Sequence, residues 1–168
     1  KLLAVGLELI QFPYTFEYGE GGVWGTVADL TLGRNPYPPF PFASPPYILT
    51  NYPPVYSAVV AAISSLFAIP PRGVGRALSV ACTLGNAIII SLIVLMANKS
   101  YHSHRTVKYA SALAALAFLT SAPVLKWSPC MRVDMLALFL SLIGLWAFIK
   151  SNGRIAWLCL ADCAFVLS

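Results

Sequence analysis

Residues Glu17–Tyr56 read EYGEGGVWGTVADLTLGRNPYPPFPFASPPYILTNYPPVY, and they lie between strongly apolar segments. The stretch is rich in Pro, Gly and aromatic residues, and it holds three of the chain's six carboxylates: Glu17, Glu20 and Asp29. Apolar segments are expected in lipid, whereas a polar, proline-rich stretch would leave unpaired backbone groups there. We therefore expect this stretch to be the extracytoplasmic loop of a membrane enzyme and to carry part of its active site.

The composition indicates a membrane protein. Hydrophobic residues make up 58% of the chain and charged residues 10%, and the mean hydropathy is +0.75. Soluble domains, in which about 25% of residues are charged, could not cover so much apolar surface. We assign the net charge of +5 to loops, since no basic patch with interleaved aromatics indicates nucleic-acid binding. The predicted fold is an all-α, polytopic transmembrane helical bundle in the plasma or inner membrane.

The sequence does not begin with Met, and both ends lie in apolar segments. We therefore expect the chain to be part of a longer protein and to form a single membrane domain. Residues 1–11 are too short to cross a hydrocarbon core of about 30 Å, which needs about 20 residues, so we interpret them as the outer end of a first span. Glu8 in this segment is costly in lipid, which makes it a weak functional candidate.

The distribution of charge predicts the topology. The most basic short loop is Asn98–Lys108, and it should be cytoplasmic by the positive-inside rule. Residues 12–75 then form an outer loop with juxtamembrane helices. The apolar run 55–69 has both ends on the outer side, so it should lie in the interface or dip in and return. The predicted spans that follow are residues 76–97, 109–125, 133–149 and 155–168.

The outer loop contains a predicted helix that carries two of its acids. Val23 and Val27 have helical spacing after Glu20, and Gly33 is a helix stop. Asp29 is nine positions from Glu20, about 180° around a helix, so the two carboxylates should point apart. Glu20 can face a cavity, and Asp29 should face water. The structural alternative for Glu20 is that acids stabilise helix N-termini.

A second outer segment, KWSPCMRVD at Lys126–Asp134, is expected on the same membrane face as Glu20. It carries Arg132 and Asp134 at the start of a helix, where an Asp is also favoured by the helix dipole. Asp162 lies deeper in the last predicted span and needs a partner or a cavity. The cysteines follow no metal-ligand spacing and are interpreted as packing residues.

The order of these features resembles the C superfamily of membrane glycosyltransferases. This group includes the dolichyl-phosphate-mannose protein mannosyltransferases and the bacterial enzymes that move aminoarabinose onto lipid A. The shared features are an acid after the first span, a helix ending in Gly, the NYPPVY motif, an Arg at a span start, and W…RVD before another span. In that family the acidic motif is commonly Asp-Glu. Here Gly19-Glu20 occupies its place, with Glu17 nearby as a substitute, and NYPPVY lacks the His or Lys that often precedes the two prolines.

The resemblance implies that a sugar moves from a polyprenyl phosphate to a hydroxyl on a protein, lipid or glycan at the extracytoplasmic face. Glu20 is then the expected general base, with Glu17 as its substitute, and Asp134 would orient Arg132 or the acceptor. Arg132 and Arg76 would contact the phosphate of the leaving group, because a guanidinium offers a bidentate match to it.

The aromatic residues of the outer segments leave two interpretations open. Tyr37, Tyr52, Tyr56 and Trp127 could stack on a sugar or belong to the interfacial aromatic belt. The identity of the sugar and acceptor, and any requirement for a divalent metal, also stay open.

The competing function is a transporter or a non-catalytic membrane subunit. A transporter would place charged residues and broken helices near the bilayer midplane, whereas the polar features here gather at one outer face.

The topology can be tested by cysteine labelling in intact cells. In a background without the natural cysteines, Ser44→Cys should react with a membrane-impermeant thiol reagent, and Ser103→Cys should react only after permeabilisation. The reverse pattern would show that the orientation is inverted.

Overall fold

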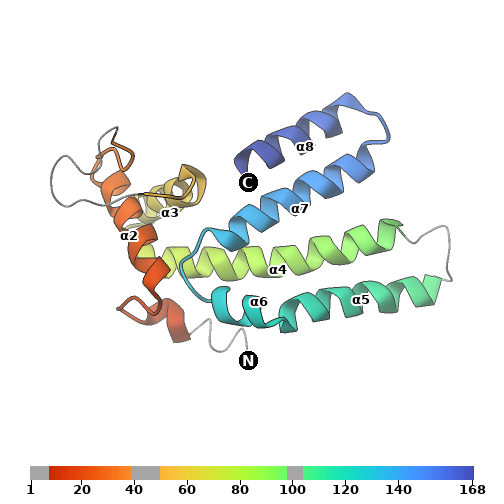
Figure 1. Ribbon diagram of the computed structural model, residues 1–168, viewed down its shortest axis with the longest axis horizontal. Helices are drawn as coiled ribbons and strands as arrows, with labels where there is room; N and C mark the ends of the chain where they lie inside the picture. Colours follow the sequence, from red (N-terminus) through yellow and green to blue (C-terminus); the bar gives the residue numbers. More distant parts are fainter. Residues whose placement is uncertain (1–7, 39–49, 98–103) are drawn as a thin grey trace. The chain divides into compact units, whose positions relative to one another are not determined.

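The computed structural model describes residues 8–38, 50–97 and 104–168. Every regular element in these ranges is a helix, and no strand occurs among them, which confirms the all-α prediction (Figure 1). The chain divides into two compact units. The first comprises Lys1–Val80 and Trp127–Val133, and the second comprises Ala81–Lys126 and Asp134–Ser168. Helix α4 (Pro71–Ala97) begins in the first unit and continues into the second.

In the first unit, α2 (Tyr18–Thr31) packs against α3 (Pro54–Phe67). The buried apolar side chains include Val23 and Val27 of α2 and Val60 of α3, each at most 2% exposed. The predicted helix stop at Gly33 is confirmed, because α2 ends at Thr31 and Gly33 has a left-handed φ of +69°.

Helix α3 begins with a proline and ends on a left-handed residue. Pro54 is its first residue, where the missing N–H costs no hydrogen bond. Ala68 caps the other end with φ 52°. The interfacial run predicted at 55–69 is therefore a single helix of 14 residues. That length is shorter than the roughly 20 residues a span requires.

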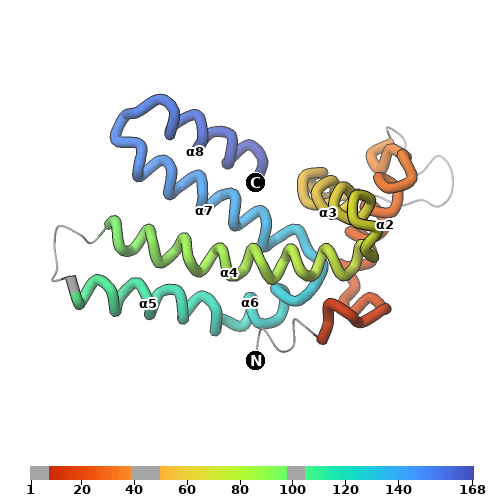
Figure 2. The backbone as a smooth tube through the Cα atoms, turned by 180° about the vertical axis from the view of Figure 1, so that it is seen from behind, coloured from red at the N-terminus to blue at the C-terminus, as the bar shows by residue number. Residues whose placement is uncertain are grey.

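The second unit contains α5 (His104–Thr120), nearly all of α6 (Ala122–Trp127), α7 (Asp134–Ser151) and α8 (Ile155–Leu167). Helices α7 and α8 form an antiparallel hairpin, as both views show (Figure 2). Its turn contains two residues with positive φ, Asn152 and Gly153. A Cβ on Gly144 would lie 3.0 Å from the ring of Phe165, so this glycine allows the two helices to approach closely.

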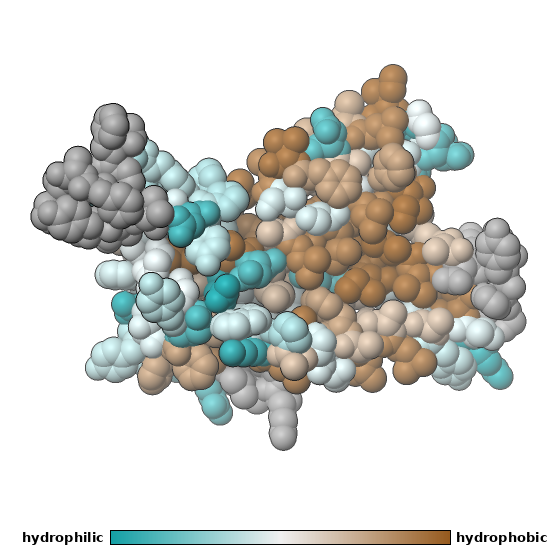
Figure 3. All heavy atoms as spheres, viewed as in Figure 1, coloured by the Kyte–Doolittle hydropathy of each residue, from teal (hydrophilic) through white to brown (hydrophobic). Residues whose placement is uncertain are grey.

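Two of the described helices, α4 and α7, are long and apolar enough to cross a membrane. Only 22% of the residues in the most apolar window of each helix are buried within the structure. In the view of Figure 3, hydrophobic residues, shown in brown, gather on the surface around α4 and α7. Outward-facing apolar side chains on helices of this length indicate a protein associated with a membrane.

The other predicted spans correspond to shorter helices. The segment 109–125 is divided at Ser121 between α5 and α6, which have 17 and 6 residues. Helix α8, at the predicted span 155–168, has 13 residues. A bundle that crosses the membrane at all four positions stays a prediction.

Candidate functional site

A buried ion pair in the first unit joins Glu20 and Arg76, which are 56 residues apart in the sequence. Both side chains are buried, with 2% and 0% of their surface exposed. The guanidinium and carboxylate meet through two parallel hydrogen bonds: Nε donates to Oε1 at 2.9 Å, and Nη2 donates to Oε2 at 2.8 Å. Charge-assisted hydrogen bonds are stronger than neutral ones, and the bidentate geometry adds specificity to the pair.

The backbone completes the hydrogen bonding of the Glu20 carboxylate. The backbone N–H of Met131 donates to Oε1 at 2.7 Å, and that of Phe16 donates to Oε2 at 2.7 Å. Each carboxylate oxygen therefore accepts two hydrogen bonds. The residue joins the start of α2 to the loop before α7, which follows it by more than a hundred positions.

Arg76 uses its remaining donors on the segment before α2. Nη1 donates to the carbonyl oxygens of Leu9 and Phe12, and Nη2 donates to that of Tyr14 at 2.7 Å. With the two bonds to Glu20, all five N–H groups of the guanidinium are engaged. Arg76 therefore fixes the path of residues 9–14 and retains no donor for a substrate phosphate.

The protonation of Glu20 follows from these contacts. Burial alone would raise its pKa, but the hydrogen bonds from Arg76, Met131 and Phe16, together with the charge of Arg76, outweigh that effect. The pKa of Glu20 is consequently lowered from the ordinary value of 4.5. A general base must come within hydrogen-bond reach of the proton that it removes. A buried carboxylate with both oxygens occupied does not offer that access, so the geometry favours a structural role for Glu20.

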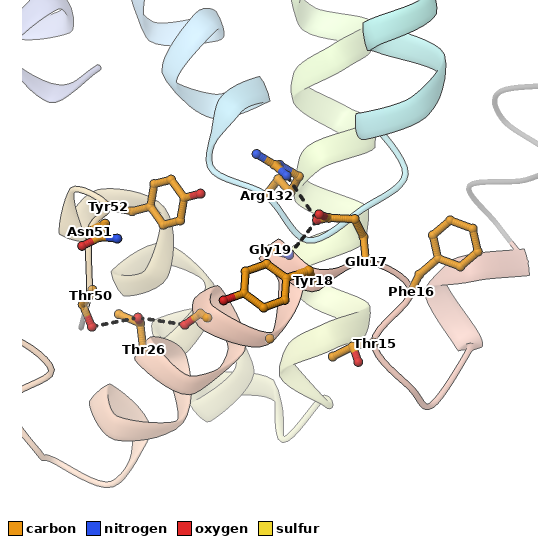
Figure 4. A pocket seen from close by; sticks show the side chains of 12 residues that line it. Thr15, Phe16, Glu17, Tyr18, Gly19, Thr26, Thr50, Asn51, Tyr52 and Arg132 are labelled. Carbon is orange, nitrogen blue, oxygen red and sulfur yellow. Dashed lines mark hydrogen bonds and ion pairs between the residues drawn. The ribbon is translucent and has the colours of Figure 1, made fainter. Parts of the chain in front are cut away.

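A cavity of about 660 Å³ lies in the first unit, and its lining includes the residues on either side of Glu20 (Figure 4). The volume is typical of small-molecule sites, about 300–1,000 Å³. The cavity is lined by the segment before α2, the first turns of α2, the segment before α3, and one arginine. The lining residues are Thr15, Phe16, Glu17, Tyr18, Gly19, Gly21, Gly22, Thr26, Thr50, Asn51, Tyr52 and Arg132.

One end of the cavity carries a second, more accessible ion pair. Glu17 is the N-cap of α2, and its Oε2 accepts hydrogen bonds from the backbone N–H of Gly19 at 2.8 Å and from Nη1 of Arg132 at 3.1 Å. The side chains of Glu17 and Arg132 are 23% and 19% exposed. A Cβ on Gly19 would lie 2.8 Å from this Oε2 and 3.0 Å from this Nη1. The glycine therefore lets the ion pair lie directly over the helix.

Trp127 and Ser79 position Arg132. The guanidinium carbon lies 4.4 Å from the centroid of the Trp127 ring, a cation–π contact. The hydroxyl of Ser79 donates to the backbone carbonyl of Arg132 at 3.2 Å. The Trp127 ring thus contacts the guanidinium of Arg132. This contact directly supports neither stacking on a sugar nor a place in the interfacial aromatic belt.

The opposite end of the cavity is uncharged. The hydroxyl oxygens of Thr26 and Thr50 lie 3.4 Å apart, and Thr26 donates to the carbonyl of Gly22 at 3.1 Å (Figure 4). Asn51 and Tyr52 continue the wall, and the Tyr37 hydroxyl donates to the backbone carbonyl of Tyr52 at 2.8 Å. Thr26, Thr50, Gly21 and Gly22 were not predicted as site residues from the sequence, and Asn51 and Gly19 entered only as members of the NYPPVY and Gly19-Glu20 motifs. The only sequence pattern that could have indicated the lining glycines is the run GEGG, residues 19–22, at the start of a predicted helix.

Several other candidates are not among the residues that line the cavity. Tyr56 is 2% exposed, and its hydroxyl donates to the carbonyl of Gly75 at 2.7 Å, so it packs the interior instead of presenting its ring to a ligand. Asp29 pairs with Arg34 at 3.8 Å, and both side chains are partly exposed. Asp134 is exposed at the first residue of α7, and Asp162 is exposed on α8, both in the second unit.

The described residues hold no group of three or more His, Cys, Asp or Glu side chains that could bind a metal ion. Cys130 lies near the two glutamates, but burial, followed by the charges of Glu20 and Glu17, raises the pKa of its thiol to about 11. A thiol with that pKa is almost fully protonated at neutral pH, so Cys130 is not an activated nucleophile.

Comparison of the chain with protein-family models, curated proteins and solved structures finds no match.

The Glu20–Arg76 pair predicts a large effect on stability. Glu20→Gln leaves the buried Arg76 charge without its counter-ion, which should lower the free energy of unfolding by about 3–5 kcal/mol. Glu17→Gln, in the partly exposed pair, should lower it by about 1 kcal/mol or less. Thermal unfolding of the detergent-solubilised protein measures both.

The pH dependence provides a control for this prediction. Because folding lowers the pKa of Glu20, its stabilisation is complete above the ordinary value of 4.5 and is lost as the pH falls through the folded-state pKa. Glu20→Gln should therefore weaken the acid dependence of the melting temperature. Equal stability losses for the two variants, with unchanged acid dependence, would contradict a buried ion pair at Glu20.

Proposed function

We propose that the chain is part of a polytopic membrane glycosyltransferase of the C superfamily. It would transfer a sugar from a polyprenyl phosphate to a hydroxyl acceptor at the extracytoplasmic face. The observation that carries this proposal is the cavity with a partly exposed carboxylate and a partly exposed guanidinium, 3.1 Å apart, at one end. A hydroxyl that must lose a proton and a phosphate that must leave as an anion need these two groups together.

Glu17 takes the role of general base in this proposal, in place of Glu20. Both hydrogen bonds to Glu17 use Oε2, and Oε1 accepts none from the described part of the chain. One carboxylate oxygen is thus held in position by Gly19 and Arg132, and the other can receive a proton. Glu20, three residues later, holds the first turn of α2 in place and acts as a positioning residue.

Arg132 is the proposed phosphate contact. It lines the cavity, and its stacking on Trp127 fixes the plane of the guanidinium. Its Nη1 donates to Oε2 of Glu17. A donor phosphate that binds Arg132 would compete with Glu17 for this group and would leave the carboxylate as a freer proton acceptor.

The proposed step is a single displacement. The acceptor hydroxyl oxygen attacks the anomeric carbon of the sugar, and the bond from that carbon to the phosphate oxygen breaks. The phosphate leaves with the bonding electron pair, and Glu17 takes the proton of the hydroxyl. Inversion at the anomeric carbon follows from attack opposite to the leaving group. The polyprenyl chain of the donor would remain in lipid beside the apolar helices.

The alternative of a transporter is less well supported. A transporter is expected to use charged residues and interrupted helices near the membrane midplane. The two helices that could cross a membrane carry charged side chains only near their ends: Arg72 and Arg76 at the start of α4, and Asp134 and Lys150 in α7. The charged residues that line the described cavity, Glu17 and Arg132, belong instead to the first unit.

The proposal predicts that Glu17→Gln lowers transfer by roughly 10²-fold or more, because the proton acceptor is lost. The protein should remain folded. Transfer from radiolabelled dolichyl-phosphate mannose in proteoliposomes that contain the full-length protein is a suitable first assay, followed by other polyprenyl-phosphate sugars.

Asp29→Asn is the matched control, since it removes a partly exposed carboxylate of the same helix that does not line the cavity. This variant should transfer nearly as fast as the wild type. Near-normal turnover of Glu17→Gln, with any donor that the wild type uses, would exclude Glu17 as the base.

A further inference from the structure

The cavity differs in charge from one end to the other. Glu17 and Arg132 are its only charged lining residues among those described. The wall formed by Thr50, Asn51 and Tyr52 belongs to a long sequence segment, Asn35–Pro71, that contains no charged residue and no histidine. Among the described lining residues, a charged partner for an ionised ligand group therefore occurs only at the Glu17–Arg132 end.

Two glycines form part of the cavity lining. Gly21 and Gly22 lie in α2, and a Cβ added to either would meet no atom of the described residues within 4 Å. Neither has a positive φ, so the backbone does not require glycine at these positions. Each helical glycine costs about 0.5–1 kcal/mol relative to alanine. Packing does not require glycine at these positions, and a side chain at Gly21 or Gly22 would project into the cavity that both residues line.

The walls beside the glycines offer groups that suit a sugar ring. The hydroxyls of Thr26 and Thr50 and the amide of Asn51 can donate and accept hydrogen bonds, as sugar hydroxyls require. Tyr52 is 37% exposed and Tyr18 is 97% exposed. Both can pack an aromatic face against the C–H groups of a pyranose and contribute a hydroxyl at the edge.

We infer that the uncharged end of the cavity is a binding subsite for a neutral pyranose, with the bare face of α2 at Gly21 and Gly22 as its floor. This inference rests on the proposed function and adds the substrate class: a neutral hexose instead of an amino sugar or a uronic acid. An ammonium or carboxylate on the sugar would lose water there and find no charged partner. The phosphate of the donor would lie at Arg132.

Two glycines of the same helix provide a matched pair of variants. Gly22→Leu would fill the cavity floor. Gly25→Leu changes a glycine one turn away whose added Cβ would also meet no described atom within 4 Å, but which does not line the cavity. Both substitutions should raise helix propensity equally, so both variants should fold.

The measurement is binding of dolichyl-phosphate mannose and of dolichyl phosphate to the full-length protein in detergent micelles. The difference between the two ligands isolates the contribution of the sugar. For the wild type and for Gly25→Leu, mannose should strengthen binding at least about tenfold. For Gly22→Leu the gain should vanish, while binding of dolichyl phosphate persists. A dolichyl-phosphate amino sugar should bind the wild type about tenfold more weakly than the mannose ligand.

The outcomes separate the subsite from the transferase. Equal binding of the two dolichyl ligands to the wild type would overturn the subsite, as would equal effects of Gly22→Leu and Gly25→Leu or a preference for the amino sugar. A Gly22-sensitive gain from mannose supports the subsite. If that gain is found while transfer is absent with every donor and acceptor tested, the subsite stands and the proposed transferase function fails.

Discussion

The buried ion pair between Glu20 and Arg76 is the interaction on which the first unit depends. It joins the segment before α2, the first turn of α2, the start of α4 and the backbone at Met131 through seven hydrogen bonds. Neither charge would be tolerated in the interior without its partner, because an unpaired buried ion costs several kcal/mol. The pair therefore fixes the positions of these four segments relative to one another. The cavity depends on those positions, because residues of these segments or their neighbours line it.

The two glutamates at the start of α2 are three residues apart and differ in what they can do. Glu20 is buried, with every hydrogen-bonding position of its carboxylate occupied, whereas Glu17 is partly exposed at the edge of the cavity. In the proposed function, the buried acid therefore has the structural role and the partly exposed acid contacts the ligand. Arg76 and Arg132 divide in the same way, since only Arg132 lines the cavity.

Local patterns in the sequence predicted most of the helices. Proline at the first turn of α3 and Gly33 after α2 set the ends of these helices through the local backbone geometry. Such effects depend only on neighbouring residues, so the sequence pattern reveals them. The break at Ser121 was missed although Pro123 follows it, because the apolar run obscured the helix start at Ala122. The burial of Glu20 could not be predicted in the same way. Its partners lie 56 and 111 positions away, and nothing near Glu20 in the sequence distinguishes a base from a counter-ion.

Chemical modification of carboxylates tests the division between the two glutamates most directly. The folded protein in its membrane is treated with a water-soluble carbodiimide and an amine, and modified peptides are quantified by mass spectrometry. Glu17 should be modified and Glu20 protected, and both should react after denaturation. Modification of Glu20 in the folded protein at the rate seen for Glu17 would contradict the buried ion pair and the assignment of roles that rests on it.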